Sequence, residues 1–257
     1  MTTEDVKLPA WYDGPPAPKP GMGRALYTTN KHPIFYLMIL KCGCTFLRNL
    51  LFHIDHDQLH PDAGRIHAYD ADFVKAAHIP HQIIRDEGAL FAVVRAPMDR
   101  FLSLYFDKIA DPGNQTDAWM RRRIGKGAGL TLEGTLSIED HRANCLLMLD
   151  WIKRNLDDGT EGKTNPHWQR QSVSVNRIKA FQPHLIPLEH MQEELARLLI
   201  EVVPDIKERM AAVTQRNVST KLFAKSEFVT PELNEMVAKV YGTDADLHRL
   251  SLERMKG

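Results

Sequence analysis

Residues 34–45, Ile-Phe-Tyr-Leu-Met-Ile-Leu-Lys-Cys-Gly-Cys-Thr, decide the fold of this chain. The first seven are continuously apolar, which is typical of a short strand buried on both faces of a parallel sheet. Residues 45–51 then space their apolar side chains as a helix does, behind Thr45, which can act near a helix N-cap. The stretch therefore predicts a strand, a tight loop and a helix, the arrangement of a phosphate-binding turn.

A second strand-to-helix unit follows. Residues 89–94, Ala-Leu-Phe-Ala-Val-Val, predict a buried strand that Arg95 ends, and Pro97 suits the first turn of a helix that runs to about Ile109. Strands that alternate with helices predict an α/β fold, and we expect three α/β/α layers with a central parallel sheet, similar to the P-loop NTPases. Ligands of such folds collect at the carboxyl ends of the strands, where both units have their loops.

Three more helices and one strand are predicted downstream. Ser137 and Asp140 form a capping-box pattern that opens a helix to about residue 155. The remaining expected elements are a strand at 184–188, a helix at 191–203 and a last helix from 230 to about 241. Residues 111–135, by contrast, are polar and Gly-rich, and predict a mobile insertion that could face a substrate.

Length and charge bound the class of protein. The 257 residues, 43% of them hydrophobic, suit one α/β domain, which we assign to residues 24–257 behind an extended, Pro-rich arm at residues 1–23. Lys plus Arg and Asp plus Glu number 33 each, so no overall positive field recruits nucleic acid or an anionic membrane. Any anion site must therefore be local, and nothing in the sequence encodes an oligomeric state.

The cysteines and the apolar runs indicate a cellular setting. Cys42, Cys44 and Cys145 do not suggest a disulfide framework, and one C-x-C pair without further Cys or His spacing is weak evidence for zinc. We interpret Cys42 and Cys44 as small residues that line a tight anion loop. No apolar run is long enough for a signal sequence or a membrane span, so we expect a soluble, cytoplasmic protein.

The loop at residues 41–45 has the chemistry of an anion site. Its backbone N–H groups and a helix N-terminus attract negative charge, and Gly43 lets the backbone approach an anion closely. Lys41 adds a full positive charge and Thr45 a hydroxyl donor. A Walker motif is missing because Lys41 precedes the glycine and no strand ends in a convincing Walker B Asp, which disfavours an Mg²⁺-dependent ATPase.

A second set of polar residues follows the second strand. Arg95 stands at the strand end, and Arg100 and Ser103 lie on the helix behind Pro97. We expect their guanidinium and hydroxyl groups to point to the same crevice as the first loop, where an Arg and a hydroxyl can hold a second phosphate.

The two motifs together resemble a known family. Residues 41–45 resemble the 5′-phosphosulfate loop of the sulfotransferases that use 3′-phosphoadenosine 5′-phosphosulfate (PAPS), and residues 95–105 resemble their 3′-phosphate motif. Within this family, the motifs most resemble those of the Golgi carbohydrate sulfotransferases. Three further stretches, 165–171, 185–199 and 217–220 with the final helix, are similar to that family, so the likeness spans roughly residues 34–250. The chain departs from it in lacking a membrane anchor, in its short length and in Ala96.

The resemblance implies an activity and a set of binding residues. Sulfuryl passes from PAPS to an acceptor hydroxyl of a carbohydrate or another small molecule, leaving PAP (3′-phosphoadenosine 5′-phosphate), and no metal is required. Arg95 and Ser103 then bind the 3′-phosphate, and Ser219 and Thr220 close over the donor. The residues implied to bind the 5′-phosphosulfate are Lys41, Cys42, Gly43, Cys44 and Thr45.

The catalytic groups are a cation and a base. Lys41 suits the leaving phosphate oxygen, and a histidine suits the proton of the attacking hydroxyl. Of 12 histidines, His78 and His167 are our leading candidates for the base. For each, a structural role as a cap or a solvent-facing ring is the competing interpretation. The lesser candidates are His81, His32 and Glu189.

Two other functions and one other surface stay open. A kinase-like phosphotransferase would need Mg²⁺ and carboxylates to hold it, and a non-catalytic nucleotide-binding module would need no base. The adjacent arginines 121–123 could face an anionic acceptor, although such a run more commonly forms a solvated surface.

Overall fold

The computed structural model describes residues 8–17, 25–111, 113, 118–158, 164–213 and 223–255. By its internal contacts the chain divides into two compact units. We call Met1–Val94, Ser174–Asn217 and Ser251–Gly257 the sheet unit, and Arg95–Val173 with Val218–Leu250 the helical unit. The assignment of residues 24–257 to one sulfotransferase domain stays a prediction.

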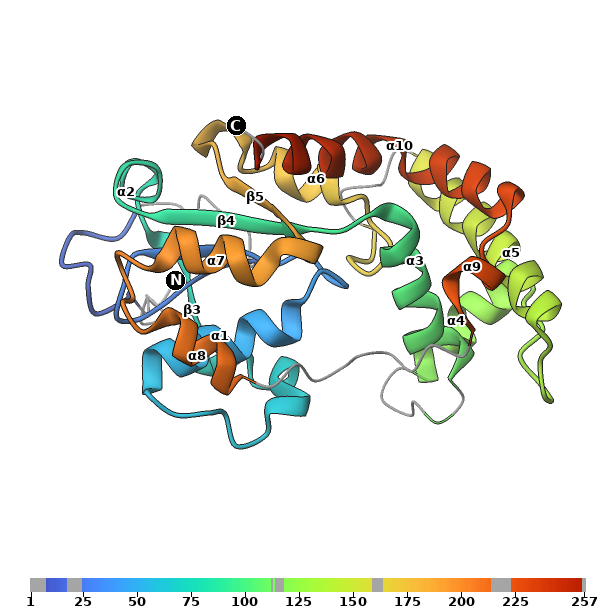
Figure 1. The fold of residues 1–257 in the computed structure, drawn as a ribbon, viewed down its shortest axis with the longest axis horizontal. Helices are drawn as coiled ribbons and strands as arrows, with labels where there is room; N and C mark the ends of the chain where they lie inside the picture. Colours follow the sequence, from blue (N-terminus) through green and yellow to red (C-terminus); the bar gives the residue numbers. More distant parts are fainter. Residues whose placement is uncertain are drawn as a thin grey trace, which may run out of the picture. The chain divides into compact units, whose positions relative to one another are not determined.

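The sheet unit contains a five-stranded mixed sheet (Figure 1). Its strands, in the order β3-β1-β2-β4-β5, are β1 (Leu26–Thr28), β2 (Ile34–Leu37), β3 (Val74–Lys75), β4 (Ala89–Val94) and β5 (His184–Pro187). β2, β4 and β5 run parallel, as predicted, whereas β1 is antiparallel to both β2 and β3. The connection from β1 to β2 spans only residues 29–33, and so short a link can join only antiparallel neighbours. The α/β class is confirmed, with a sheet that is mixed instead of wholly parallel.

The two central strands are buried on both faces. All four residues of β2 are buried, as are the last five of β4. Within this core the ring of Tyr36 stacks on Phe91, with 5.4 Å between ring centroids. β4 has the predicted bounds, but β2 ends at Leu37, three residues early, because the chain turns out of the sheet toward the loop at residues 41–43.

Helices flank this sheet. α7 (Met191–Leu199) packs on β4 and β5, and α8 (Ile206–Ala212) packs on both α7 and α1 (Cys44–His56). α2 (His81–Asp86) precedes β4. Short 3₁₀ helices complete the unit, namely η1 (Ala63–Ala68), η2 (Asp70–Asp72), η3 (Ala76–His78), η7 (Lys179–Phe181) and η8 (Leu188–His190).

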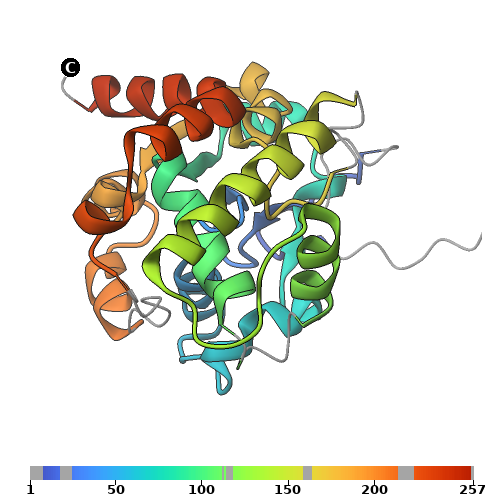
Figure 2. The ribbon, with the colours of Figure 1, turned by 90° about the vertical axis from the view of Figure 1, so that its right-hand side faces the viewer.

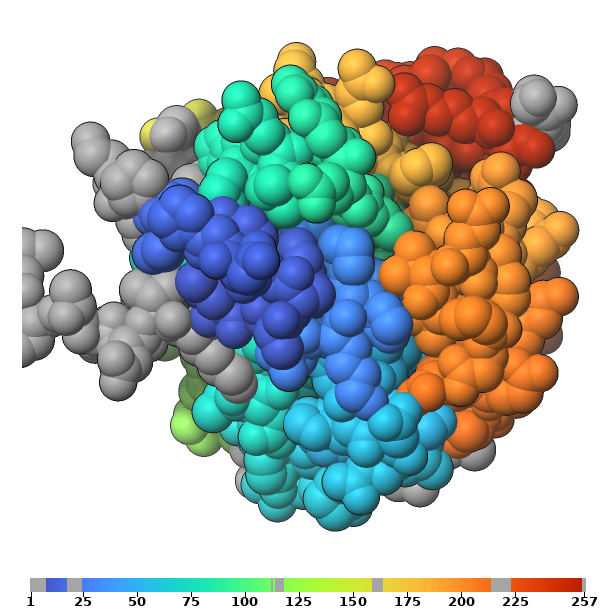
Figure 3. Space-filling model, turned by 90° about the vertical axis from the view of Figure 1, so that its left-hand side faces the viewer, coloured from blue at the N-terminus to red at the C-terminus, as the bar shows by residue number. Residues whose placement is uncertain are grey.

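Residues 8–17 of the Pro-rich N-terminal stretch contact the sheet unit (Figure 3, dark blue). The indole Nε1 of Trp11 donates to the Thr29 carbonyl at 2.9 Å, and its ring meets Phe35 edge-on. Farther along, the backbone N–H of Ala17 donates to the His78 carbonyl at 2.8 Å. These contacts attach the segment to strand and loop residues of the sheet unit.

The helical unit follows β4 (Figure 2). Its helices are α3 (Pro97–Tyr105), the π-helix η4 (Phe106–Ala110), α4 (Ala118–Ala128), α5 (Ile138–Asp157), α9 (Lys225–Phe228) and most of α10 (Pro231–Arg254), and α6 (Gln171–Asn176) begins in it. The predicted capping box is confirmed, because Ser137 Oγ accepts from the Asp140 N–H while the Asp140 carboxylate accepts from the Ser137 N–H. In the part of the chain that the structure describes, no helix is long and apolar enough to cross a membrane.

Helix α4 occupies part of the segment that we expected to be a mobile insertion. Met120, Ile124 and Ala128 recur at helical spacing and are buried in the core of this unit, a pattern that the surrounding glycines and arginines obscure in the sequence. Arg121 donates to the carbonyls of Ile109 at 3.0 Å and Leu132 at 2.6 Å. The run at 121–123 is therefore partly structural, and its other two members are exposed.

Candidate functional site

The loop between β2 and α1 adopts an unusual backbone. Lys41 has φ 68° and Gly43 has φ 73°, so two residues of the loop lie in the left-handed region. Cys42 donates its N–H back to the Ile39 carbonyl at 3.3 Å, which closes the turn. Gly43 is the N-cap of α1, and no described side chain caps the helix. The positive end of the α1 dipole therefore lies at this loop and favours negative charge there.

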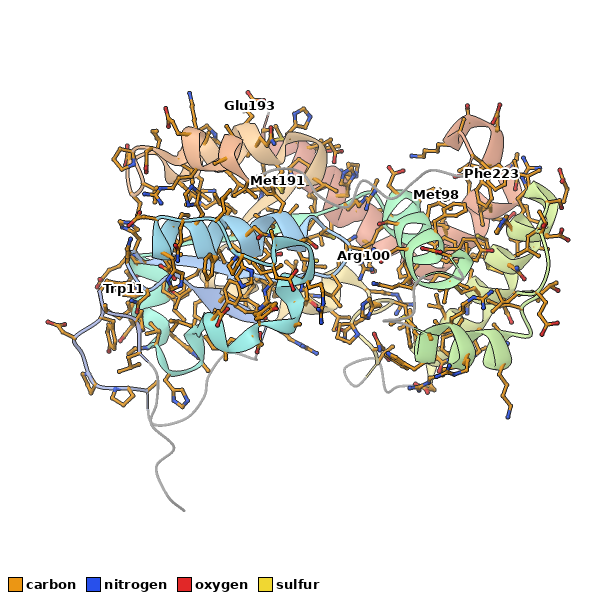
Figure 4. The ribbon with its side chains drawn as sticks, turned by 90° about the horizontal axis from the view of Figure 1, so that it is seen from below. Trp11, Met98, Arg100, Met191, Glu193 and Phe223 are labelled. Carbon is orange, nitrogen blue, oxygen red and sulfur yellow. The ribbon has the colours of Figure 1, made fainter. Side chains whose placement is uncertain are left out.

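Gly43 fits this loop for two reasons. A side chain is strained at its positive φ, and a Cβ there would lie 3.0 Å from Leu188 Cδ1 and 3.1 Å from Met191 Sδ. Both neighbours belong to the start of the α7 region, where Met191 is labelled in Figure 4. The missing side chain thus lets the loop pack closely on Leu188 and Met191.

The two loop cysteines are buried thiols. Burial raises the pKa of Cys44, while the backbone N–H groups of Lys41, Cys44 and Thr45 and the charge of Lys41 act in the opposite direction. These donors therefore face the Cys44 sulfur, and because burial outweighs them the thiol itself stays protonated. No group of three or more His, Cys, Asp or Glu side chains among the described residues is arranged to hold a metal ion.

A histidine that the sequence did not single out touches the loop. The Nε2 atom of His67 lies 3.2 Å from Thr45 Oγ1, and its ring is exposed. Asn49, one turn into α1, donates its side-chain N–H groups to the carbonyls of Thr45 at 2.8 Å and Ala63 at 3.0 Å, which ties η1 to the loop. His67 lies 22 residues beyond Thr45 in an irregular, polar stretch, so no spacing rule could have identified it.

Arg48 holds the segment downstream of His67. Its guanidinium is buried, lies 4.1 Å from the ring centroid of Phe73 and donates to the Tyr69 carbonyl at 3.3 Å. Asp70 Oδ1 lies 3.5 Å from the same nitrogen. A buried cation one turn into α1 needs such partners, and its charge adds to the positive potential near the loop.

Arg95 and Ser103 belong to the helical unit. Arg95 directly follows β4 and is half-buried, α3 begins at Pro97 as predicted, and Ser103 is half-buried on α3. The backbone of Arg95 is held on both sides, because its N–H donates to Gln171 Oε1 and its carbonyl accepts from Gln171 Nε2, each at 2.9 Å.

Arg100 has a structural role that the sequence did not predict (Figure 4). Its buried guanidinium donates to the carbonyls of Gln169 at 2.9 Å and Pro166 at 3.2 Å. The expectation that Arg100 faces a bound anion is therefore wrong, because these backbone carbonyls take its donors. In this position Arg100 fixes the segment that carries His167.

The two predicted bases differ in how they are held. His167 Nδ1 lies 2.8 Å from Asn165 Oδ1, and an amide oxygen can only accept, so Nδ1 carries the proton and a neutral ring has its lone pair on Nε2. His78 ends η3 and is half-buried, and its carbonyl accepts from Ala17. His78 lies in the sheet unit with the loop, and His167 in the helical unit with Arg95 and Ser103.

The remaining site residues are less informative. His81 is exposed and meets Phe181 edge-on, and Glu189 is exposed in η8. Burial lowers the pKa of His32, which favours its neutral form. Ser219 and Thr220 lie outside the described residues, so their proposed closure over the donor stays a prediction.

A comparison with protein families assigns the class of protein. The model of the sulfotransferase family matches residues 24–250, and the chain belongs to that family. A search of curated proteins and a search of solved structures gave no match. The resemblance inferred from the two motifs is thereby confirmed, and sulfuryl transfer is the general activity of this family.

We predict that Gly43→Ala destabilises the protein by about 1–2 kcal/mol, because the alanine must adopt the left-handed conformation and its Cβ meets Leu188 and Met191. Denaturant unfolding measures the change. Gly64→Ala is the matched control, since this exposed glycine has nothing within 4 Å of an added Cβ, and we expect a change within about 0.5 kcal/mol. Equal effects at the two sites would contradict this account of the loop.

Proposed function

We propose that the protein is a PAPS-dependent sulfotransferase that transfers the sulfuryl group of PAPS to an acceptor hydroxyl and releases PAP. The observation that carries the proposal is the turn with two left-handed residues, Lys41 and Gly43, at the uncapped N-terminus of α1. Such a turn aims backbone N–H groups and a helix dipole at one point, and Lys41 adds a charge there. Membership of the sulfotransferase family supports the same activity.

The loop residues fit the 5′ end of the donor. We assign the phosphosulfate to Lys41, Cys42, Gly43, Cys44 and Thr45, in the manner of a P-loop-like α/β fold. The left-handed turn at the N-terminus of α1 and the charge of Lys41 support the assignment. Arg95 and Ser103 are assigned to the 3′-phosphate by their motif, and Ser219 and Thr220 to the closure over the donor.

The chemistry asks the protein to position groups and stabilise charge. The acceptor oxygen forms a bond to sulfur as the bond from sulfur to the 5′-phosphate oxygen breaks, so charge develops on that phosphate. Lys41 suits this charge. The acceptor hydroxyl loses its proton to a base in the same step.

We propose His67 as the leading base, with His78 and His167 as its competitors. His67 Nε2 lies 3.2 Å from Thr45 Oγ1, a residue of the loop to which we assign the phosphosulfate, and this contact supports the choice. When Nε2 accepts a hydrogen bond from the Thr45 hydroxyl, the neutral ring has its lone pair on the nitrogen nearest the loop. The Asn165 contact gives His167 an oriented ring as well, so the three need an experimental comparison.

A carbohydrate is the acceptor that we propose, in a cytoplasmic setting as the sequence predicted. An open pocket of about 450 Å³ lies in the sheet unit. Its lining combines rings with polar groups, as sugar sites do, and includes Phe52, His56, Gln58, His60, Tyr69 and Asp72. Rings cover the apolar faces of a sugar and the polar groups bind its hydroxyls.

We predict that PAP binds without Mg²⁺. Titration calorimetry with PAP in the presence of a chelator should show one site, because Lys41, Arg95 and backbone N–H groups supply the charge that a kinase takes from its metal. ATP that binds only with added Mg²⁺ would instead support the phosphotransferase. Tight PAP binding without transfer of labelled sulfuryl from PAPS to any glycan, lipid or phenol would support the non-catalytic module.

Separate replacement of the three histidines by glutamine distinguishes the base. With labelled PAPS and the best acceptor of that panel, we predict that His67→Gln lowers kcat by about 100-fold or more and removes the acid limb of the rate profile. His78→Gln and His167→Gln should stay near wild type. A selective loss of activity in either of these two variants would assign the base to that histidine. Near-wild-type rates in all three variants would exclude His67, His78 and His167.

A further inference from the structure

A buried glutamine clamps the backbone of Arg95. The side chain of Gln171 is fully buried, and its amide makes two hydrogen bonds of 2.9 Å, one from the Arg95 N–H and one to the Arg95 carbonyl. These are the two bonds that a neighbouring strand would make to a residue in a sheet. Gln171 therefore fixes the peptide groups on both sides of the Arg95 Cα, at the point where the chain leaves β4.

The clamp is itself anchored by a buried carboxylate. Asp244 on α10 accepts from the backbone N–H of Gln171 at 2.8 Å and of Ser172 at 2.9 Å. Asp244 is only 1% exposed, so these two N–H groups replace water as hydrogen-bond partners of its carboxylate. The result is a chain of contacts from Asp244 through Gln171 to Arg95, all within the helical unit.

We infer that Gln171 is a positioning residue for Arg95, and Asp244 for Gln171. The inference rests on the proposed function, in which Arg95 binds the 3′-phosphate of the donor. A guanidinium recognises phosphate through two paired N–H donors in a fixed geometry. If the backbone moves at the Arg95 Cα, both donors lose their alignment with the phosphate. Glutamine suits the task because its amide holds one donor and one acceptor side by side, whereas glutamate lacks the donor and methionine lacks both.

The helical unit contains a matched control for the clamp. Asn144 is equally buried and grips the backbone of Thr131 in the same way, since its Oδ1 accepts from the Thr131 N–H at 2.9 Å and its Nδ2 donates to the Thr131 carbonyl. Thr131 has no place in the proposed donor site. Removing the Asn144 clamp should therefore cost stability without changing how the protein recognises a 3′-phosphate.

The experiment compares the binding of two nucleotides that differ only in that phosphate. Calorimetry gives the two dissociation constants, and the constant of adenosine 5′-phosphate divided by that of PAP measures the 3′-phosphate contribution. We predict that Gln171→Met reduces this ratio by about tenfold while the affinity for adenosine 5′-phosphate stays unchanged. Asn144→Leu should leave the ratio at the wild-type value. In an Arg95→Ala background, Gln171→Met should have no further effect on the ratio, because the clamp acts through Arg95.

The outcomes separate the two claims. A wild-type protein that binds both nucleotides equally, or an Arg95→Ala variant that keeps the preference for PAP, would contradict the proposed role of Arg95. A ratio that depends on Arg95 but is unchanged in Gln171→Met would overturn the clamp. Should Gln171→Met not fold, as judged by circular dichroism, the same comparison with Asp244→Asn decides, since it keeps the size of the side chain that anchors Gln171 and loses one of the two acceptors for the backbone N–H groups of Gln171 and Ser172.

Discussion

The left-handed turn at Lys41 and Gly43 is the constraint on which the rest of the sheet unit depends. It ends β2 early, starts α1 without a side-chain cap, and packs against Leu188 and Met191 through the space that Gly43 leaves. A lysine in this conformation is disfavoured by about 1 kcal/mol or more, and such strain persists where the surroundings over-determine it. The turn thereby brings Lys41 and the N-terminus of α1 together in the loop to which we assign the 5′ end of the donor.

Local patterns in the sequence correctly predicted several helices and strands. The apolar run of β4 gave its bounds, and Ser137 with Asp140 marked the start of α5, because each depends on neighbours within a few residues. The shortened β2, the mixed sheet and α4 were missed. In each case an effect outside the local pattern decided. The chain leaves the sheet early at the turn, the link after β1 is short, and α4 buries one apolar face that its arginines and glycines obscure in the sequence.

The candidate site was predictable where it consists of a contiguous motif and unpredictable where it depends on folding. Lys41, Gly43, Arg95 and Ser103 lie in two motifs and were identified, although the structure does not test their binding roles. His67 and Gln171 were missed because their partners lie 22 and 76 residues away in the sequence. The motif suggested Arg100 as an anion ligand, but its guanidinium donates to backbone carbonyls, and only the folded chain distinguishes these two roles.

The affinity of Lys41→Ala for PAP tests the central claim most directly, because it asks whether this loop holds the 5′ end of the nucleotide. Titration calorimetry without metal should show binding at least about tenfold weaker than wild type, as expected for the loss of a charged partner to phosphate. Lys31→Ala is the control, since this exposed lysine of the same unit pairs with Asp57 and should bind PAP as wild type does. Equal affinity in Lys41→Ala and wild type would contradict the account.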